Sequence, residues 1–278
     1  TKPPFEAVVE SGRVYGRGTA DMKGFVAAAL SCAGIAAQRH LQTPLQTPLH
    51  LALSYDEEIG CVGVRSLIEM LAAAPVKPAM CIVGEPTAMA IATGHKGKTA
   101  IEAACVGSAA HSALAPQAVN AIHLACDLIA QIRHLQDDMV TDGARDSAYY
   151  IPYTTLHAGL ITSGVALNIV PDHAVVTFEI RNLAADDPEA ILYRLRRAIA
   201  PVIAVARKRD AEADIMFKVI NSYPGLETSL DEAVVAMVAE LTGRDERIKV
   251  AFGTEGGLFS QRLGIPAVVC GPGSMEQG

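Results

Sequence analysis

Apolar runs of strand length alternate with longer helical stretches over residues 1–95. A mainly apolar run from Leu49 to Tyr55 lies between prolines and an acidic turn, which is typical of a buried strand. An alanine-rich stretch without proline predicts a helix over Met22–His40. Strands that alternate with helices indicate βαβ units and a mostly parallel sheet. The other elements expected here are strands at Arg13–Tyr15 and Ala79–Val83 and a helix at Val62–Ala74.

Near His95 the pattern changes to longer strands and helices in the order β-α-β-β-α-β. This order is the split βαβ, or ferredoxin-like, arrangement of a self-contained domain of roughly 100 residues. Its predicted strands are Lys98–Val106, Thr155–Ile161, Ala174–Ile180 and Ala213–Ile220, and its helices are Asn120–Leu135 and Pro188–Ala206. From Pro224 the earlier pattern returns. We therefore expect an α/β protein in which residues 1–95 and 223–278 form one domain and residues 96–222 form an inserted domain.

Composition and charge narrow the class of protein. The chain has 278 residues, half of them hydrophobic, which is enough for a substantial core. Its net charge of −7 argues against a nucleic-acid partner. The six cysteines have no paired spacing and lie mostly in apolar runs, which indicates free thiols in a reducing compartment, the cytoplasm. No signal peptide is evident, and no apolar run approaches the roughly 20 residues that span a bilayer, so we expect no membrane partner.

Acidic residues follow three apolar or glycine-rich runs in the first third of the chain, at Asp21, at Asp56-Glu57-Glu58 and at Glu85. We expect these acids at the carboxyl ends of strands, where ligands gather in parallel sheets. Converging carboxylates repel one another unless a cation is present, and two divalent metals roughly 3.5–4 Å apart can hold a water nucleophile. Side chains of adjacent residues such as Glu57 and Glu58 point in different directions, so one can bind metal while the other acts as a general base. Each motif alone also fits a solvated acidic loop; together they favour a metal site.

The strings RGTADMKG, SYDEEIG and GEPT, in this order, resemble the co-catalytic zinc metallopeptidases and amidohydrolases. That family includes acetylornithine deacetylase, succinyl-diaminopimelate desuccinylase and aminoacylase. Further strings extend the resemblance over nearly the whole chain: GSAAHSALAPQAVNAI, ALNIVPDHAVVTFEIR and FGTEGGLFSQRLGIPAVVCGPGS. Within the family, IPYTTLHAGLITSGVALNIVPD and FGTEGGLF are most similar to the acetylornithine deacetylase branch. The resemblance implies hydrolysis of an N-acyl amide, with N-acetylornithine giving ornithine and acetate in arginine biosynthesis.

The resemblance also implies metal-binding and catalytic roles. Asp21 would bridge two divalent ions, Zn²⁺ with Co²⁺ or Mn²⁺ also compatible. Glu58 would bind one ion and Glu85 the other, and Glu57 would be the general base. His111, in the inserted domain, would reach across a homodimer interface and stabilise the oxyanion in the partner's active site.

Substrate contacts are implied for further positions. Asn168 and Arg181 would hold the carboxylate of the N-acyl amino acid, a task that suits the forked guanidinium of arginine. Thr254 and the Gly256-Gly257 turn would line the pocket. The inserted domain would thus act as a lid and as the dimerisation domain.

Two histidines of the family pattern are missing. No His-x-Asp motif precedes Asp21, and no histidine follows Cys270. Each metal would lack its imidazole ligand, so we expect the chain to be cut from a longer enzyme at both ends. Three alternatives stay open: a desuccinylase or dipeptidase of the same family, an inactive or binding-only fragment, and a magnesium-dependent phosphoryl-transfer domain. The last is disfavoured because no glycine-rich phosphate loop follows a strand.

Overall fold

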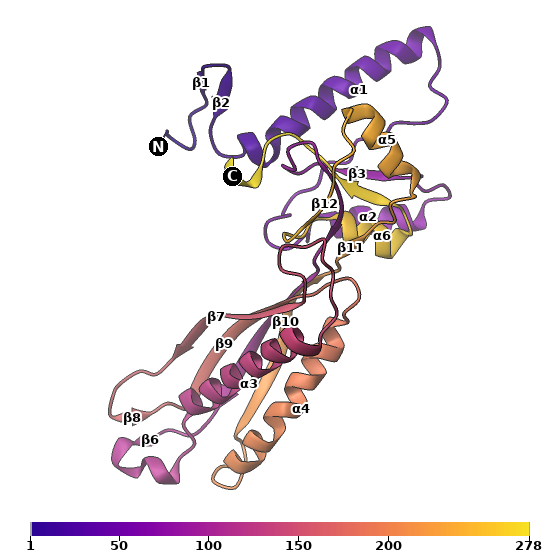
Figure 1. Cartoon of the computed structure of the whole chain (residues 1–278). Coiled ribbons are helices and arrows are strands. Elements are labelled where there is room, and N and C mark those ends of the chain that lie inside the picture. The colour runs from indigo at the N-terminus through magenta and orange to yellow at the C-terminus, as the bar shows by residue number, and fades with distance from the viewer. Residues whose placement is uncertain (1, 278) are drawn as a thin grey trace. The chain divides into compact units, whose positions relative to one another are not determined.

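The computed structural model describes residues 2–277 and divides into two compact units (Figure 1). The first unit comprises Thr1–His95 and Leu226–Gly278, and the second comprises Lys96–Gly225. Both units combine helices with sheets, which confirms the α/β class.

The first unit is organised around β4, a strand that is buried along its whole length. It pairs with β11, β12 and β13, and β13 pairs with β3. The longer pairings, β12–β4 and β13–β3, are parallel as predicted, whereas the shorter pairings, β11–β4 and β13–β4, are antiparallel. The elements of this unit are β1 (Val8–Glu10), β2 (Arg13–Tyr15), a π-helical turn η1 (Thr19–Lys23), α1 (Gly24–Gln42), α2 (Val64–Ala73), β3 (Cys81–Val83), β4 (Ile91–His95), β11 (Leu226–Glu227), α5 (Ala233–Thr242), β12 (Arg247–Val250), α6 (Gly256–Leu263), β13 (Ala267–Val269) and a 3₁₀ turn η3 (Met275–Gln277).

Two successive residues of β4 contribute to two different apolar clusters. Ile91 packs with Val234, Val235 and Val238 of α5. Ala92 joins a second cluster with Leu226. Successive side chains of a strand point to opposite faces, so β4 places one cluster on each side of the sheet.

The run from Leu49 to Tyr55 forms no strand, contrary to the prediction. Its side chains are exposed, with Leu53 at 63% and Tyr55 at 68%. Among the described residues no neighbouring strand pairs with it, and an apolar pattern without a pairing partner does not make a strand. Conversely, the strand β4 has no counterpart among the elements predicted from the sequence.

Helix α1 forms close to its predicted position but buries none of its residues. Together with the turn before it, Thr19–Gln42 is long and apolar enough to cross a membrane by length and composition alone. The expectation that no apolar run is long enough to span a bilayer is therefore wrong by this measure.

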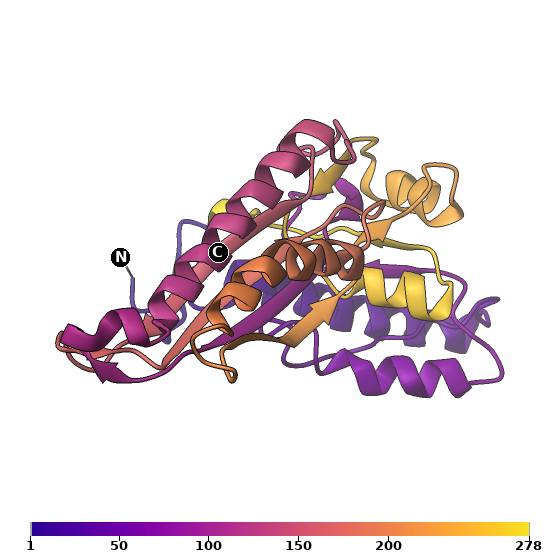
Figure 2. The ribbon, with the colours of Figure 1, turned by 90° about the horizontal axis from the view of Figure 1, so that it is seen from below.

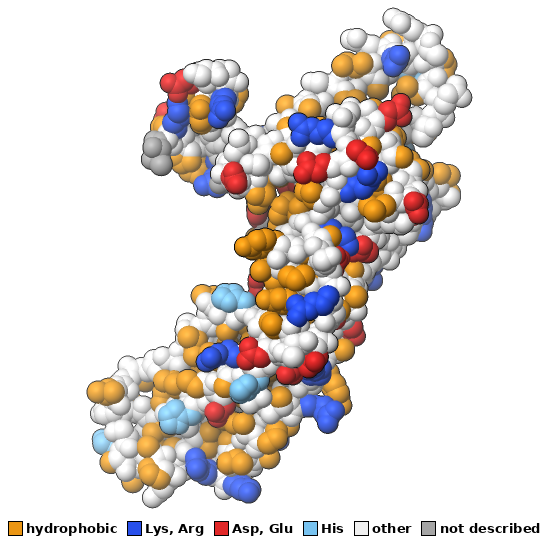
Figure 3. Space-filling model, viewed as in Figure 1, with side chains coloured by type: hydrophobic (Ala, Val, Ile, Leu, Met, Phe, Trp, Pro, Cys, Tyr) orange, Lys and Arg blue, Asp and Glu red, His pale blue; other side chains and the backbone are white. Residues whose placement is uncertain are grey.

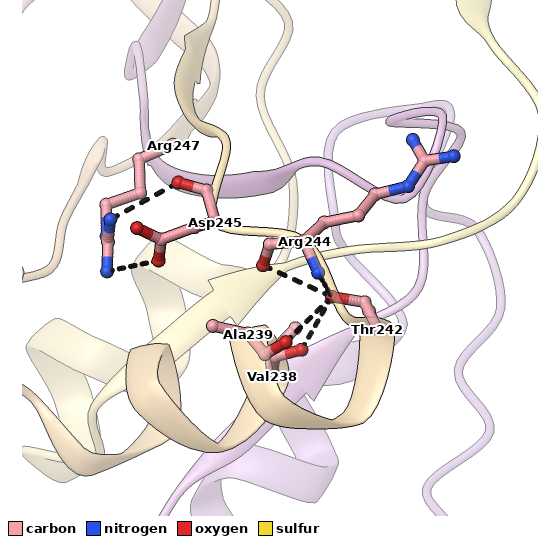
Figure 4. A network of polar contacts seen from close by, with 6 residues as sticks. All are labelled: Val238, Ala239, Thr242, Arg244, Asp245 and Arg247. Carbon is pink, nitrogen blue, oxygen red and sulfur yellow. Dashed lines mark hydrogen bonds and ion pairs between the residues drawn. The ribbon is translucent and has the colours of Figure 1, made fainter.

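At its C-terminal end, α5 leads through a short polar turn into β12 (Figure 4). The hydroxyl of Thr242 donates to the carbonyl of Val238 at 2.8 Å and accepts from the backbone N–H of Arg244 at 3.3 Å. Gly243 adopts a left-handed conformation with φ 64°, which glycine tolerates without steric cost. Arg247 and Asp245 form an ion pair at 2.8 Å at the start of β12.

The second unit has a four-stranded antiparallel sheet in the order β10-β5-β9-β7. Helices α3 and α4 cover one face of it (Figures 1 and 2). Burial alternates along β5 and β9, so every second side chain, including Ile101 and Phe178, enters the core beneath the helices. The elements are β5 (Lys98–Val106), β6 (Ala110–His111), a 3₁₀ turn η2 (Ser112–Gln117), α3 (Ala121–Asp142), β7 (Thr155–Ser163), β8 (Ile169–Val170), β9 (His173–Arg181), α4 (Pro188–Ala206) and β10 (Asp214–Tyr223).

Candidate active site

The predicted metal-binding acids all lie in the first unit, but not all at strand ends. Glu85 follows β3 as expected. Asp21 lies instead within the irregular turn η1, where its φ of −113° and ψ of 98° depart from helical values. Glu57 and Glu58 lie in the turn that follows the unpaired run ending at Tyr55. The expectation of three strand ends is therefore correct for Glu85 alone.

These acids nevertheless lie within electrostatic range of one another. The pKa of Glu85 is raised to about 8, first by burial and then by the charges of Asp21, Glu57, Glu58 and Glu255. Like charges in a partly buried site disfavour ionisation in this way. We call Asp21, Glu57, Glu58 and Glu85 the acidic cluster.

A short turn holds Glu57 in place. Its carbonyl accepts hydrogen bonds from the backbone N–H groups of Gly60 and Cys61, both at 2.8 Å. The thiol of Cys61 donates to Oε1 of the Glu57 carboxylate at 3.3 Å. Burial raises the pKa of Glu57, the Cys61 hydrogen bond lowers it, and the charges of Glu58, Glu255 and Asp21 raise it again. Burial also raises the pKa of the Cys61 thiol, so Cys61 stays a hydrogen-bond donor.

Glu255 is a further acid of this region, and sequence reasoning missed its role. It immediately precedes α6 and is only 9% exposed. Ser54 Oγ donates to its Oε2 at 2.9 Å, whereas its Oε1 is buried and has no hydrogen-bond partner among the described residues. A single acid within the glycine-rich string FGTEGG was the only available signal.

The pocket residues predicted beside Glu255 are buried at the start of α6. Thr254 is fully buried, and its hydroxyl accepts from the N–H of Gly256 at 3.0 Å. The N–H of Gly257 donates to Nε2 of the buried His95 at 3.3 Å. Both backbone donors at the beginning of this helix therefore have partners within the chain.

The acidic cluster matches the donor type and charge of a divalent metal site. Carboxylate oxygens are ligands for hard and borderline dications, and a cation would relieve the repulsion that raises the pKa of Glu85. Over residues 2–277, however, no three His, Cys, Asp or Glu side chains are arranged to hold one ion. The carboxylate donors therefore have the right chemistry for a divalent metal ion, but the described residues do not form a complete ligand set.

Two of the predicted residues of the second unit lie together. His111 ends β6, where it is paired with Ile169 of β8. The N–H of Ser112, next to it, donates to the carbonyl of Asn168 at 2.9 Å. His111 Nδ1 accepts from the N–H of Ala113 at 3.2 Å. On the face in Figure 3, exposed histidines (pale blue) gather over this unit.

Arg181 lies elsewhere in the same unit. It is the last residue of β9, roughly 26 Å along the strand from His173, and the loop carrying Asn168 leads into the opposite end. Its guanidinium donates to Glu179 at 2.9 Å and to the hydroxyl of Tyr223 at 3.2 Å. Within one chain, the second unit thus brings His111 and Asn168 together and holds Arg181 apart from them.

Comparison with known proteins shows that the sequence is similar to one protein family along its whole length. Residues 1–278 match the family described as Peptidase family M20/M25/M40. The chain is 32% identical over 268 residues to acetylornithine deacetylase of Myxococcus xanthus, covering 96% of this chain and 66% of the relative. It is 33% identical over 279 residues to the acetylornithine deacetylase of Proteus mirabilis, covering 100% of this chain and 68% of the relative. The chain spans about two thirds of the length of these relatives.

Solved structures support the fold. Aminopeptidase PepT from Bacillus cereus superposes with a TM-score of 0.69 at 22% identity, over 96% of this chain and 67% of that one. Human carnosine dipeptidase 1 superposes with a TM-score of 0.62 at 15% identity, over 96% and 68%.

Proposed function

Because this chain belongs to peptidase family M20/M25/M40, we propose that it carries the catalytic carboxylates and the lid of a metal-dependent amidohydrolase. Its substrate would be an N-acyl amino acid, specifically N-acetylornithine, which places the enzyme in arginine biosynthesis. The main support for this proposal is the acidic cluster, where partial burial and then the charges of the neighbouring carboxylates raise the pKa of Glu85 to about 8. The names of the relatives from Myxococcus xanthus and Proteus mirabilis support the choice of acyl substrate.

Asp21, Glu58 and Glu85 would hold two divalent ions, Zn²⁺ or alternatively Co²⁺ or Mn²⁺. When bound, such ions polarise the amide carbonyl and lower the pKa of water. The reasons for this assignment are the carboxylate donors and their mutual repulsion, described above.

Glu57 is the general base of the proposed reaction. The Cys61 thiol occupies Oε1 of its carboxylate, which leaves Oε2 to take the proton from the attacking water. Glu57 then delivers that proton to the leaving amine, since one group that accepts and returns a proton serves both halves of an amide hydrolysis.

The second unit supplies substrate contacts in a homodimer. A strand length separates Arg181 from the His111–Asn168 region, so one copy does not readily present all three residues to the same small substrate. Two copies resolve this: Arg181 holds the substrate carboxylate in its own site, while His111 and Asn168 serve the partner's site. His111 there donates to the oxyanion, where a hydrogen bond is most valuable in the transition state.

We place the enzyme in the cytoplasm without a membrane partner or nucleic-acid partner. All six cysteines are free thiols, which suits a reducing compartment.

The test is Glu57→Gln in the purified, Zn²⁺-loaded protein. We expect kcat for N-acetylornithine to fall roughly 10²- to 10⁴-fold while the bound zinc, measured by atomic emission, is unchanged. Glu69→Gln, at another glutamate of this unit outside the acidic cluster, is the control. Undiminished turnover by Glu57→Gln would refute the assignment of the base. Parallel assays with N-succinyl-diaminopimelate and dipeptides decide between this substrate and those of related family members.

A further inference from the structure

Glu255 is a carboxylate for which the proposed reaction has no use. It contributes to the raised pKa of Glu57 and of Glu85, so it lies beside the acidic cluster. It is more than nine-tenths buried, yet it belongs neither to the proposed metal ligands nor to the general base.

The side chain has no evident structural task either. Although Glu255 precedes α6, its carboxylate makes no hydrogen bond to the end of that helix. The helix donors that it might have satisfied are bonded to Thr254 Oγ1 and His95 Nε2. A buried glutamate kept for helix capping would accept those bonds itself.

One oxygen of Glu255 is satisfied and the other is not. Ser54 Oγ donates to Oε2 at 2.9 Å, while Oε1 is buried with no partner over residues 2–277. A buried acceptor left without a donor is destabilising, and more so when it is charged. Burial raises the pKa of Glu255, and the hydrogen bond from Ser54 opposes that rise; a cation beside Oε1 would favour the ionised form. The missing partner is therefore a donor that also carries positive charge.

An ammonium group matches the bonding capacity of Glu255 Oε1 better than a metal ion does. It is a compact charge with N–H donors, and it needs only the single oxygen that Ser54 leaves open. A metal ion needs several converging ligands, whereas Glu255 offers the one oxygen that has no partner over residues 2–277.

We propose that Glu255 binds the side-chain ammonium of the substrate, so that the protein selects N-acyl amino acids whose side chain ends in a primary amine. This inference rests on the proposed amidohydrolase function and adds the determinant of its side-chain specificity. Ser54 is the positioning residue that orients the carboxylate through Oε2.

The experiment compares N-acetylornithine with N-acetylnorvaline, which has the same carbon chain without the amine. Binding is measured by isothermal titration calorimetry, with and without Zn²⁺, and kcat/KM is measured where turnover occurs. We expect the wild-type protein to prefer N-acetylornithine, and Glu255→Gln to reduce that preference roughly 10- to 100-fold, the range for a charged hydrogen bond. The affinity for N-acetylnorvaline should be unchanged.

The control variants keep every outcome informative. Glu240→Gln makes the same change at an exposed position of α5 and should leave the preference intact. If Glu255→Gln does not fold by circular dichroism, Glu255→Asp, which retains the charge on a shorter side chain, should bind N-acetylornithine more weakly and N-acetylnorvaline as before.

Three results would overturn the inference: no ligand preference or no binding in the wild type, an equal loss for both ligands in the variant, or a loss of zinc affinity with the preference unchanged. The last result would make Glu255 a metal ligand. Selective, Glu255-dependent binding of N-acetylornithine without any hydrolysis would instead refute the proposed function and leave the inference standing.

Discussion

Replacing Gly63 by alanine tests whether the turn carrying Glu57 and Glu58 must keep its present position. Gly63 is buried directly before α2 and has φ −70° and ψ −30°, a conformation that alanine adopts without strain. The obstacle is space. A Cβ atom at this position would lie 2.0 Å from the carbonyl oxygen of Tyr55.

The size of the effect follows from that distance. Ordinary van der Waals contact begins near 3.4 Å, so the two segments must separate by 3.4 minus 2.0 Å, about 1.4 Å. The neighbouring atom belongs to the backbone and cannot rotate away. Overpacking of this kind costs about 1–3 kcal/mol of stability, and a displacement of about 1 Å in catalytic groups can cost about 10²-fold in rate.

The assay combines thermal unfolding, followed by circular dichroism, with kcat for N-acetylornithine in the Zn²⁺-loaded protein. Gly34→Ala is the control, because Gly34 lies in exposed α1 and its Cβ would meet nothing within 4 Å. Alanine is favoured over glycine inside a helix by up to about 1 kcal/mol, so this variant should be slightly more stable and equally active. Wild-type stability and turnover in Gly63→Ala would refute the argument that this close contact fixes the turn.

Two further predictions concern the acidic cluster. Zn²⁺ at a hundredfold excess over its Kd should raise the free energy of unfolding by about 2.7 kcal/mol, and EDTA should reverse this rise. An equal rise in the Asp21→Asn variant would contradict the bridging role of Asp21. Cys61→Ala removes the donor to Glu57 Oε1 and should lower kcat about tenfold, since hydrogen bonds to charged groups contribute about 1.5–3 kcal/mol. The control variant Cys61→Ser retains a donor, so its kcat should stay near that of the wild type. Identical kinetics of the two variants would show that the thiol does not position Glu57.

The sequence alone determined the second unit well. The strand Lys98–Val106 and the helix Pro188–Ala206 have the predicted bounds, and Asp187, directly before that helix, accepts from the N–H of Glu189 at 3.0 Å. These elements are long and strongly periodic, so each specifies its own type and its buried face through nearby residues. The motif strings likewise identified the family, because they are contiguous stretches of sequence.

Only the tertiary structure decided the sheet of the first unit and the surroundings of its acids. Ile91–His95 has the weak strand sequence IATGH, yet it becomes the central strand because three distant segments pair with it. Leu49–Tyr55 has the stronger strand sequence and remains unpaired. Glu255 is notable only because Ser54, 201 positions away, bonds one of its oxygens while no other described residue bonds the second. Pairing and hydrogen-bond satisfaction depend on partners far along the chain, and local pattern does not contain them.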